Sequence, residues 1–161
     1  MLISQVLFLN SCGLFKPKHA EKESSLSTYE KKLGIALPAD VNMNYIKEIS
    51  KHLNAPYKYG GNGQPGFDCS GLVHLVYQNI FKQSVPRQSS QLHQKAKKIN
   101  KDKLQVADLY FFNINGKGVD HVGMHIYQDY FIHASTKMGV IVSSLTEPYY
   151  KKTFISYGSV F

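Results

Sequence analysis

The sequence predicts an α+β fold in which N-terminal helices pack on an antiparallel sheet formed by the second half of the chain. Apolar residues recur at helical spacing in the first half, whereas short β-branched and aromatic segments separated by turn residues fill the second half. Neither half contains an internal repeat. A chain of 161 residues is long enough for one domain with a sizeable core and too short for two comfortable ones.

The first segment, residues 1–12, is predicted to be a targeting segment. The run LISQVLFLNSC is apolar, too short to span a bilayer, and ends in a polar step at Cys12. Residues 9–12 resemble the lipobox of bacterial lipoproteins, in which the cysteine is lipidated and becomes the new N-terminus. This resemblance implies that Cys12 is a lipidation site that anchors the chain to a membrane.

The helical half begins after a predicted flexible tether over residues 13–39, where charged residues, Ser and Pro mix with few periodic apolar positions. Over residues 41–53 the apolar positions follow a helical period, and Asp40 or Asn42 is available as the N-cap. A second helix is predicted to carry Cys69 in its first turn. It follows the turn-rich run GGNGQPG and has apolar residues at helical spacing, which are Leu72, Val73, Leu75, Val76 and Ile80.

A third, short helix is expected over residues 91–98, after which the period changes. Five antiparallel strands are predicted in the segments VADLYFFNI, GVDHVGMHIY, YFIHAS, GVIVSSL and FISYGSVF, which are short and rich in β-branched and aromatic residues. The helix that carries the cysteine is expected to pack on this sheet.

The composition is that of an ordinary globular chain with a basic surface. Hydrophobic residues make up 43% and charged residues 19% of the sequence, which argues against disorder. Lysine and arginine outnumber the acids 19 to 11, so the net charge of +8 favours an anionic partner. The lysines cluster only briefly, between Lys95 and Lys103, without a recognisable nucleic-acid-binding module. We therefore expect a solvated basic face and no nucleic acid partner.

Cys69 is a candidate nucleophile only if another group promotes its ionisation. A thiol with a pKa of about 8.5 is only a few per cent thiolate at neutral pH. A helix N-terminus stabilises a nearby anion by about 0.3–1 kcal/mol, whereas majority ionisation at pH 7 needs about 2.7 kcal/mol. An imidazolium partner is therefore expected beside the thiol.

The predicted sheet supplies His121 and His133 as that partner and its neighbour. A hairpin centred near Tyr127 would bring the two histidines opposite each other. A shift of the register by one residue would place them on opposite faces, so their parity stays open at this point. His125 shares the face of His121 by alternation and competes for either role.

Four motifs in this order, PYKYGG, FDCSGLV, DHVGMHI and FIHAS, resemble the NlpC family of bacterial cell-wall cysteine peptidases over residues 40–161. The likeness is greatest to its small lipoprotein murein endopeptidases from Gram-negative bacteria. The resemblance implies a papain-like fold with Cys69 as nucleophile, His121 as general base and His133 as the polar third member of the site. Tyr57 matches a tyrosine that lines the active site in this family.

The resemblance and the residues converge on acyl transfer, in which the thiolate attacks an amide carbonyl, the histidine protonates the leaving amine and water hydrolyses the thioester. The oxyanion site is expected at the backbone N–H of Cys69, with the Tyr57 hydroxyl. Asp68 and Ser70 flank the nucleophile and are candidates for contacts with substrate amine or carboxylate groups. Asp68 also fits simple helix capping.

The resemblance further implies peptidoglycan stem peptides as substrate, with no cofactor and no metal. The favoured bond is the D-alanyl to diaminopimelate cross-link, and the alternative is the D-glutamyl to diaminopimelate bond of the stem peptide. A monomer is expected in the cell envelope of a Gram-negative bacterium, lipid-anchored in the outer membrane and facing the periplasm.

Four other interpretations remain open. Cys69 could be an inert packed thiol, or a zinc ligand with His121 and His133, although a closed zinc site usually needs four ligands and close pairs such as CxxC. The domain could be a silent wall-binding module. It could also be a papain-like amidase or acyltransferase that acts on another amide or a lipid, because a fold does not decide a reaction.

Overall fold

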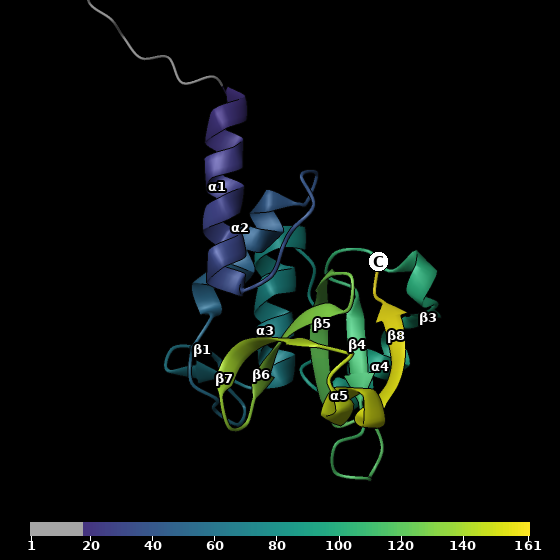
Figure 1. The fold of residues 1–161 in the computed structure, drawn as a ribbon. Helices are drawn as coiled ribbons and strands as arrows, with labels where there is room; N and C mark the ends of the chain where they lie inside the picture. Colours follow the sequence, from purple (N-terminus) through teal and green to yellow (C-terminus); the bar gives the residue numbers. More distant parts are fainter. Residues whose placement is uncertain (1–17) are drawn as a thin grey trace, which may run out of the picture.

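The computed structural model of the protein describes residues 18–161, and its helices α1 (Lys18–Leu33) to α4 (Ser89–Lys95) precede the main sheet as the sequence predicts, whereas α5 (Pro148–Thr153) lies between the last two strands (Figure 1). The predicted lipidation site Cys12 lies outside the described residues. Within the described part of the chain, no helix combines the length and the apolar character needed to cross a bilayer.

Part of the predicted tether is helical, which corrects the expectation of a flexible segment there. Helix α1 (Lys18–Leu33) projects from the domain, and its C-terminal end lies beside α2 (Figure 1). Leu26, Tyr29 and Leu33 recur at helical spacing and pack against the main core. The helix ends at Gly34, whose φ of 72° is the left-handed conformation that glycine adopts readily after a helix. Three apolar positions in a polar sequence were too few to predict this helix.

The next two helices match their predictions. Helix α2 (Met43–His52) starts after Asn42, whose side chain accepts hydrogen bonds from two backbone N–H groups, so Asn42 rather than Asp40 is the N-cap. Helix α3 (Cys69–Val76) begins at the cysteine and continues into the π-helical turn η1 (Tyr77–Phe81). A two-stranded hairpin of β1 (Asn62–Gly63) and β2 (Gly66–Phe67) precedes it.

The main sheet has six antiparallel strands in the order β3-β8-β4-β5-β6-β7, one more than predicted. The strands are β3 (Lys97–Ile99), β4 (Leu109–Phe112), β5 (His121–Tyr127), β6 (Tyr130–Ser135), β7 (Gly139–Ser144) and β8 (Phe154–Ser159). The extra strand, β3, overlaps the end of the predicted third helix, which ends earlier as α4 (Ser89–Lys95). Pairing with β8, a partner distant in the sequence, turns these three residues into an edge strand.

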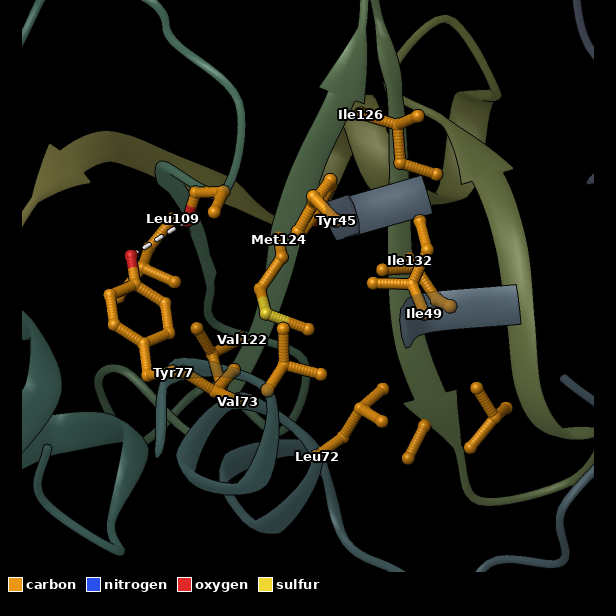
Figure 2. Packing of buried hydrophobic residues seen from close by; sticks show 14 of the residues in the cluster. Tyr45, Ile49, Leu72, Val73, Tyr77, Leu109, Val122, Met124, Ile126 and Ile132 are labelled. Atoms are coloured by element: carbon orange, nitrogen blue, oxygen red, sulfur yellow. Dashed lines mark hydrogen bonds between the residues drawn. The ribbon is translucent and has the colours of Figure 1, made fainter. Parts of the chain in front are cut away.

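The two faces of the sheet bury different kinds of side chain. On one face, aliphatic residues of β5 and β6 such as Val122, Met124 and Ile132 pack against Leu72 and Val73 of α3 (Figure 2). The opposite face carries an aromatic cluster, which consists of Tyr110, Phe112, Phe131 and Tyr150. Tyr150 comes from helix α5 (Pro148–Thr153), so α5 packs on this second face.

Candidate active site

Cys69 is the first residue of α3 and lines a cavity of about 370 Å³ together with Tyr57, His121 and His133. The structure therefore brings together the four residues that the sequence singled out from four separate motifs. A second cavity of about 500 Å³ is also lined in part by Cys69, together with Asp68, Ser70 and Arg87.

Asp68 and its loop fix the start of the helix. One carboxylate oxygen of Asp68 accepts a hydrogen bond from the backbone N–H of Gly71 at 2.6 Å, and the other accepts one from Gly60 at 2.9 Å. A side chain at position 71 would collide with the carbonyl of Gly61, so only glycine lets the loop approach the helix this closely. This close contact holds the loop after Tyr57 against the first turn of α3.

Ser70 and Asp68 are engaged within the protein. The buried Ser70 hydroxyl donates to the Arg87 carbonyl at 2.6 Å and also lies 3.1 Å from the Asp68 carboxylate. The Arg87 guanidinium lies 3.3 Å from the same carboxylate. These contacts give both residues a structural role, and their predicted contacts with substrate stay a prediction.

The two histidines interact directly. His121 Nε2 and His133 Nδ1 are 2.9 Å apart, and both rings are buried. The register of β5 and β6 pairs Met124 with Ile132, and its continuation places His133 opposite Gly123. His121 is therefore the diagonal neighbour of His133 on the same face, rather than its direct partner as a simple hairpin would have it.

A bulge in β5 puts the two histidines on one face. Next to the turn the ladder pairs Tyr127 with Tyr130, but the register shifts by one residue between His125 and Tyr127. Continued without that shift, the register at the turn would place His121 and His133 on opposite faces of the sheet. The bulge therefore settles the parity that the sequence left open.

His125, the competitor on the same strand, belongs to the aromatic cluster instead. Its Nδ1 lies 2.9 Å from the hydroxyl of Tyr110, and the two rings stack at a centroid distance of 5.7 Å. His125 lines neither cavity at Cys69. Its contacts support a structural role.

Two hydroxyl groups behind His133 had no signal in the sequence. His133 Nε2 lies 3.0 Å from the Tyr150 hydroxyl and 3.2 Å from the Ser143 hydroxyl. Tyr150 comes from α5 and Ser143 from β7, and both are buried. No motif marks either residue, because single hydroxyl side chains far apart in the sequence meet here only through the fold.

Burial favours the neutral forms of the groups in this site. It raises the pKa of the Cys69 thiol to about 11, although a hydrogen bond from the backbone N–H of Val122 lowers this pKa in part. Burial lowers the pKa of His121 to about 4, and the charge of Asp120 only partly opposes this. Burial also lowers the pKa of His133 well below its usual value. Burial therefore disfavours both charged forms of the expected resting thiolate–imidazolium pair.

Tyr57 lies close enough to Cys69 to respond to its charge. Burial raises the pKa of the Tyr57 hydroxyl, and a negative charge on Cys69 raises it further. A neutral phenol beside the sulfur is able to donate a hydrogen bond. Among the residues that the structure describes, no three His, Cys, Asp or Glu side chains are arranged to hold a metal ion.

A thiol at a helix N-terminus, sharing a cavity with a histidine pair on an antiparallel sheet, defines the class of papain-like cysteine peptidases. Within that class the chain belongs to the NlpC/P60 family, whose model matches residues 54–159. This match places all four cavity residues inside the family domain.

Individual relatives agree with this assignment. The chain is 34% identical over 115 residues to the murein DD-endopeptidase MepS/murein LD-carboxypeptidase of Escherichia coli (strain K12), covering 71% of this chain and 61% of that protein. It is 30% identical over 156 residues to a probable endopeptidase of Haemophilus influenzae (strain Rd), covering 96% of this chain and 92% of that protein. The crystal structure of an NlpC/P60 family protein from Bacillus cereus matches with a TM-score of 0.67 at 30% identity, covering 78% of this chain and 42% of that one.

Proposed function

We propose that this protein is a murein endopeptidase that hydrolyses an amide bond of peptidoglycan stem peptides through Cys69, His121 and His133. The observation that carries the proposal is the hydrogen-bonded histidine pair in the same cavity as a thiol at a helix N-terminus. The chain needs no cofactor or metal for this reaction.

The reaction begins with a neutral thiol and a neutral imidazole. Because His121 Nε2 is bonded to His133, its Nδ1 is the ring nitrogen left to take the thiol proton. The sulfur forms a bond to the carbonyl carbon as that proton moves, and the carbonyl electron pair moves to oxygen. The backbone N–H of Cys69 and the Tyr57 hydroxyl are the donors that we assign to this oxyanion.

The same histidine completes the cycle. His121 returns its proton to the leaving amine, the carbon–nitrogen bond breaks, and a thioester remains on Cys69. Water then attacks the thioester while His121 takes a proton from it, and the thiol is regenerated. His133 holds the His121 ring in place throughout.

Two features support cleavage within a chain at a cross-link. Two cavities share Cys69 in their linings, and together they provide space for an extended substrate at the thiol. The relative from E. coli is named as a DD-endopeptidase, which favours the D-alanyl to diaminopimelate cross-link over the D-glutamyl to diaminopimelate bond. The net charge of +8 suits an acidic glycopeptide mesh.

The cellular setting is part of the proposal. We assign residues 1–12 to a signal segment that ends at the lipidated Cys12, and residues 40–161 to the peptidase domain. Residues 13–39 link the two, with α1 in place of a uniformly flexible tether. A lipid anchor would hold a monomer in the outer membrane of a Gram-negative envelope, facing the periplasm, where peptidoglycan is within reach.

Digestion of purified peptidoglycan tests the function and the bond together. Mass spectrometry of the digest is expected to show cross-linked dimers converted to monomers with intact stem peptides, because only the bridge is cut. Stem peptides that end at D-glutamate would assign the alternative bond. Cys69→Ala is expected to abolish the conversion, and a Cys69→Ala protein that still cleaves would overturn the nucleophile assignment.

A further inference from the structure

The histidine pair continues into a chain of hydrogen bonds that the reaction described above does not use. His121 contacts His133, and the far nitrogen of His133 contacts Tyr150 at 3.0 Å and Ser143 at 3.2 Å. In the described part of the chain, these two hydroxyl groups are the hydrogen-bonding partners of that nitrogen. The chain runs from His121 to residues of β7 and α5, and Tyr150 also lines the cavity.

The positions of the hydrogens on the two histidine rings decide when the hydroxyl groups of Tyr150 and Ser143 are needed. Once His121 has taken the thiol proton, both of its nitrogens carry hydrogen, so its Nε2–H donates to His133 Nδ1. That nitrogen must then be bare, and the hydrogen of neutral His133 must sit on Nε2. A buried N–H needs an acceptor, and among the residues that the structure describes the oxygens of Tyr150 and Ser143 are the ones that His133 Nε2 contacts.

We propose that Tyr150 and Ser143 are positioning residues that hold His133 in its Nε2–H tautomer. In this form His133 accepts from His121, and His121 keeps its Nδ1 free as the base. The opposite tautomer would donate to His121 Nε2 and place the His121 hydrogen on Nδ1, where no proton can be accepted. This inference rests on the proposed function, because it assigns a role to the histidine pair in that reaction.

The packing around Tyr150 supports a positioning role. Its ring contacts His133, Phe131 and Phe112 at centroid distances of 5.1–5.7 Å, which fixes the phenol against the imidazole. Burial raises the pKa of the Tyr150 hydroxyl, so the phenol stays neutral and is able to act as an acceptor without adding charge. The Ser143 hydroxyl also interacts with the phenol oxygen and partly opposes this rise in the pKa of Tyr150.

The test compares the full chain with Tyr150→Phe, Ser143→Ala and the double variant. The tautomer of each histidine is read from the ¹⁵N chemical shifts of its ring, and kcat and KM are measured on a purified cross-linked muropeptide. The matched control is Tyr157→Phe, which removes a hydroxyl from a residue packed against the same aromatic cluster but not bonded to a histidine in the structure.

The wild type is expected to show His133 protonated on Nε2, and the double variant is expected to shift it to Nδ1. With that shift, kcat is expected to fall about 100-fold with KM unchanged, in line with losses of about 10–100-fold when a group that orients a site ligand is removed. Tyr150→Phe retains one acceptor, so a loss of about 10-fold is expected from it alone. It serves as the second variant if the double variant does not fold.

An unchanged His133 tautomer in a folded variant overturns the proposal, as does a wild type with its hydrogen on Nδ1. The same holds if Tyr157→Phe lowers kcat as much as Tyr150→Phe does. The chemical shifts report on the histidines without any substrate. They therefore separate failure of this inference from failure of the proposed function, which the Cys69→Ala digestion tests.

Discussion

The two faces of the main sheet bury their polar groups in different ways. On the face covered by α2 and α3, the hydroxyls of Tyr45 and Tyr77 donate to backbone carbonyls at 2.9 and 2.7 Å among aliphatic side chains. On the other face, His121, His133 and Tyr150 bond to one another through side chains. The first pattern is locked to the backbone, whereas the second can move a proton. The histidine network therefore lies on the face opposite to the aliphatic core, and Cys69 joins it from the first turn of α3.

This comparison predicts that changes on the histidine face affect the reaction and leave the fold intact. The largest expected effect is that of His121→Gln, which removes the base but keeps a polar side chain beside His133. Because general base catalysis contributes about 10²–10⁴-fold, kcat/KM on peptidoglycan fragments is expected to fall by about 10³-fold. Thermal unfolding should stay within a few degrees of the wild type, and a variant that retains a tenth of the activity would remove His121 from its role.

Leu72→Ala makes the opposite change, on the aliphatic face. Leu72 is fully buried in α3, and truncation of such a residue typically lowers the free energy of unfolding by about 2–5 kcal/mol. Urea denaturation measures this loss. Activity per folded molecule is expected to stay within about twofold of the wild type, and a large fall in kcat at full folding would show that the two faces are not separable.

The smallest expected effect concerns pH. Burial lowers the pKa of His121 to about 4, so the base stays neutral well below its usual titration range. Activity requires the neutral form and is lost as the pH falls through this lowered pKa, so kcat/KM is expected to change little between pH 7 and about 5.5. An acidic limb centred near pH 6.5 would show that the resting imidazole is not disfavoured as a cation.

The same shift links pH to folding, and its sign can be stated. Because the pKa of His121 is lower in the folded than in the unfolded chain, the unfolded chain binds the proton first as the pH falls below about 6.5. The contribution is fully present above that pH and is lost between about 6.5 and 4. Urea denaturation across this range checks the direction of the change.

Local sequence patterns predicted the parts of the fold that depend on local signals. The helical period of α2 and α3 reflects one buried helix face, and β4 to β8 were found from short β-branched and aromatic segments between turn residues. Strand β3 was missed because its three residues become a strand only by pairing with β8. Helix α1 was missed because few of its residues are apolar, although those few reach the core.

The site likewise contains residues that short sequence motifs indicate and residues that only the folded structure brings together. Cys69, His121, His133 and Tyr57 stand in short motifs, and the structure has them line one cavity, while their roles stay a prediction. The ionisation expected for the thiol depended on burial, which no motif reports. The hydroxyls behind His133 come from elements that only the folded sheet brings together, so no spacing in the sequence could have indicated them.

With the bulge in β5 in place, the number of residues between His121 and His133 decides whether the two side chains lie on the same face of the sheet. Removing one residue there would turn His121 toward the aliphatic core and leave its position in the cavity to a valine or an aspartate. Adding two residues to the hairpin would lengthen it without exchanging its faces. The strands between the two histidines therefore tolerate changes of length in even steps and not in odd ones.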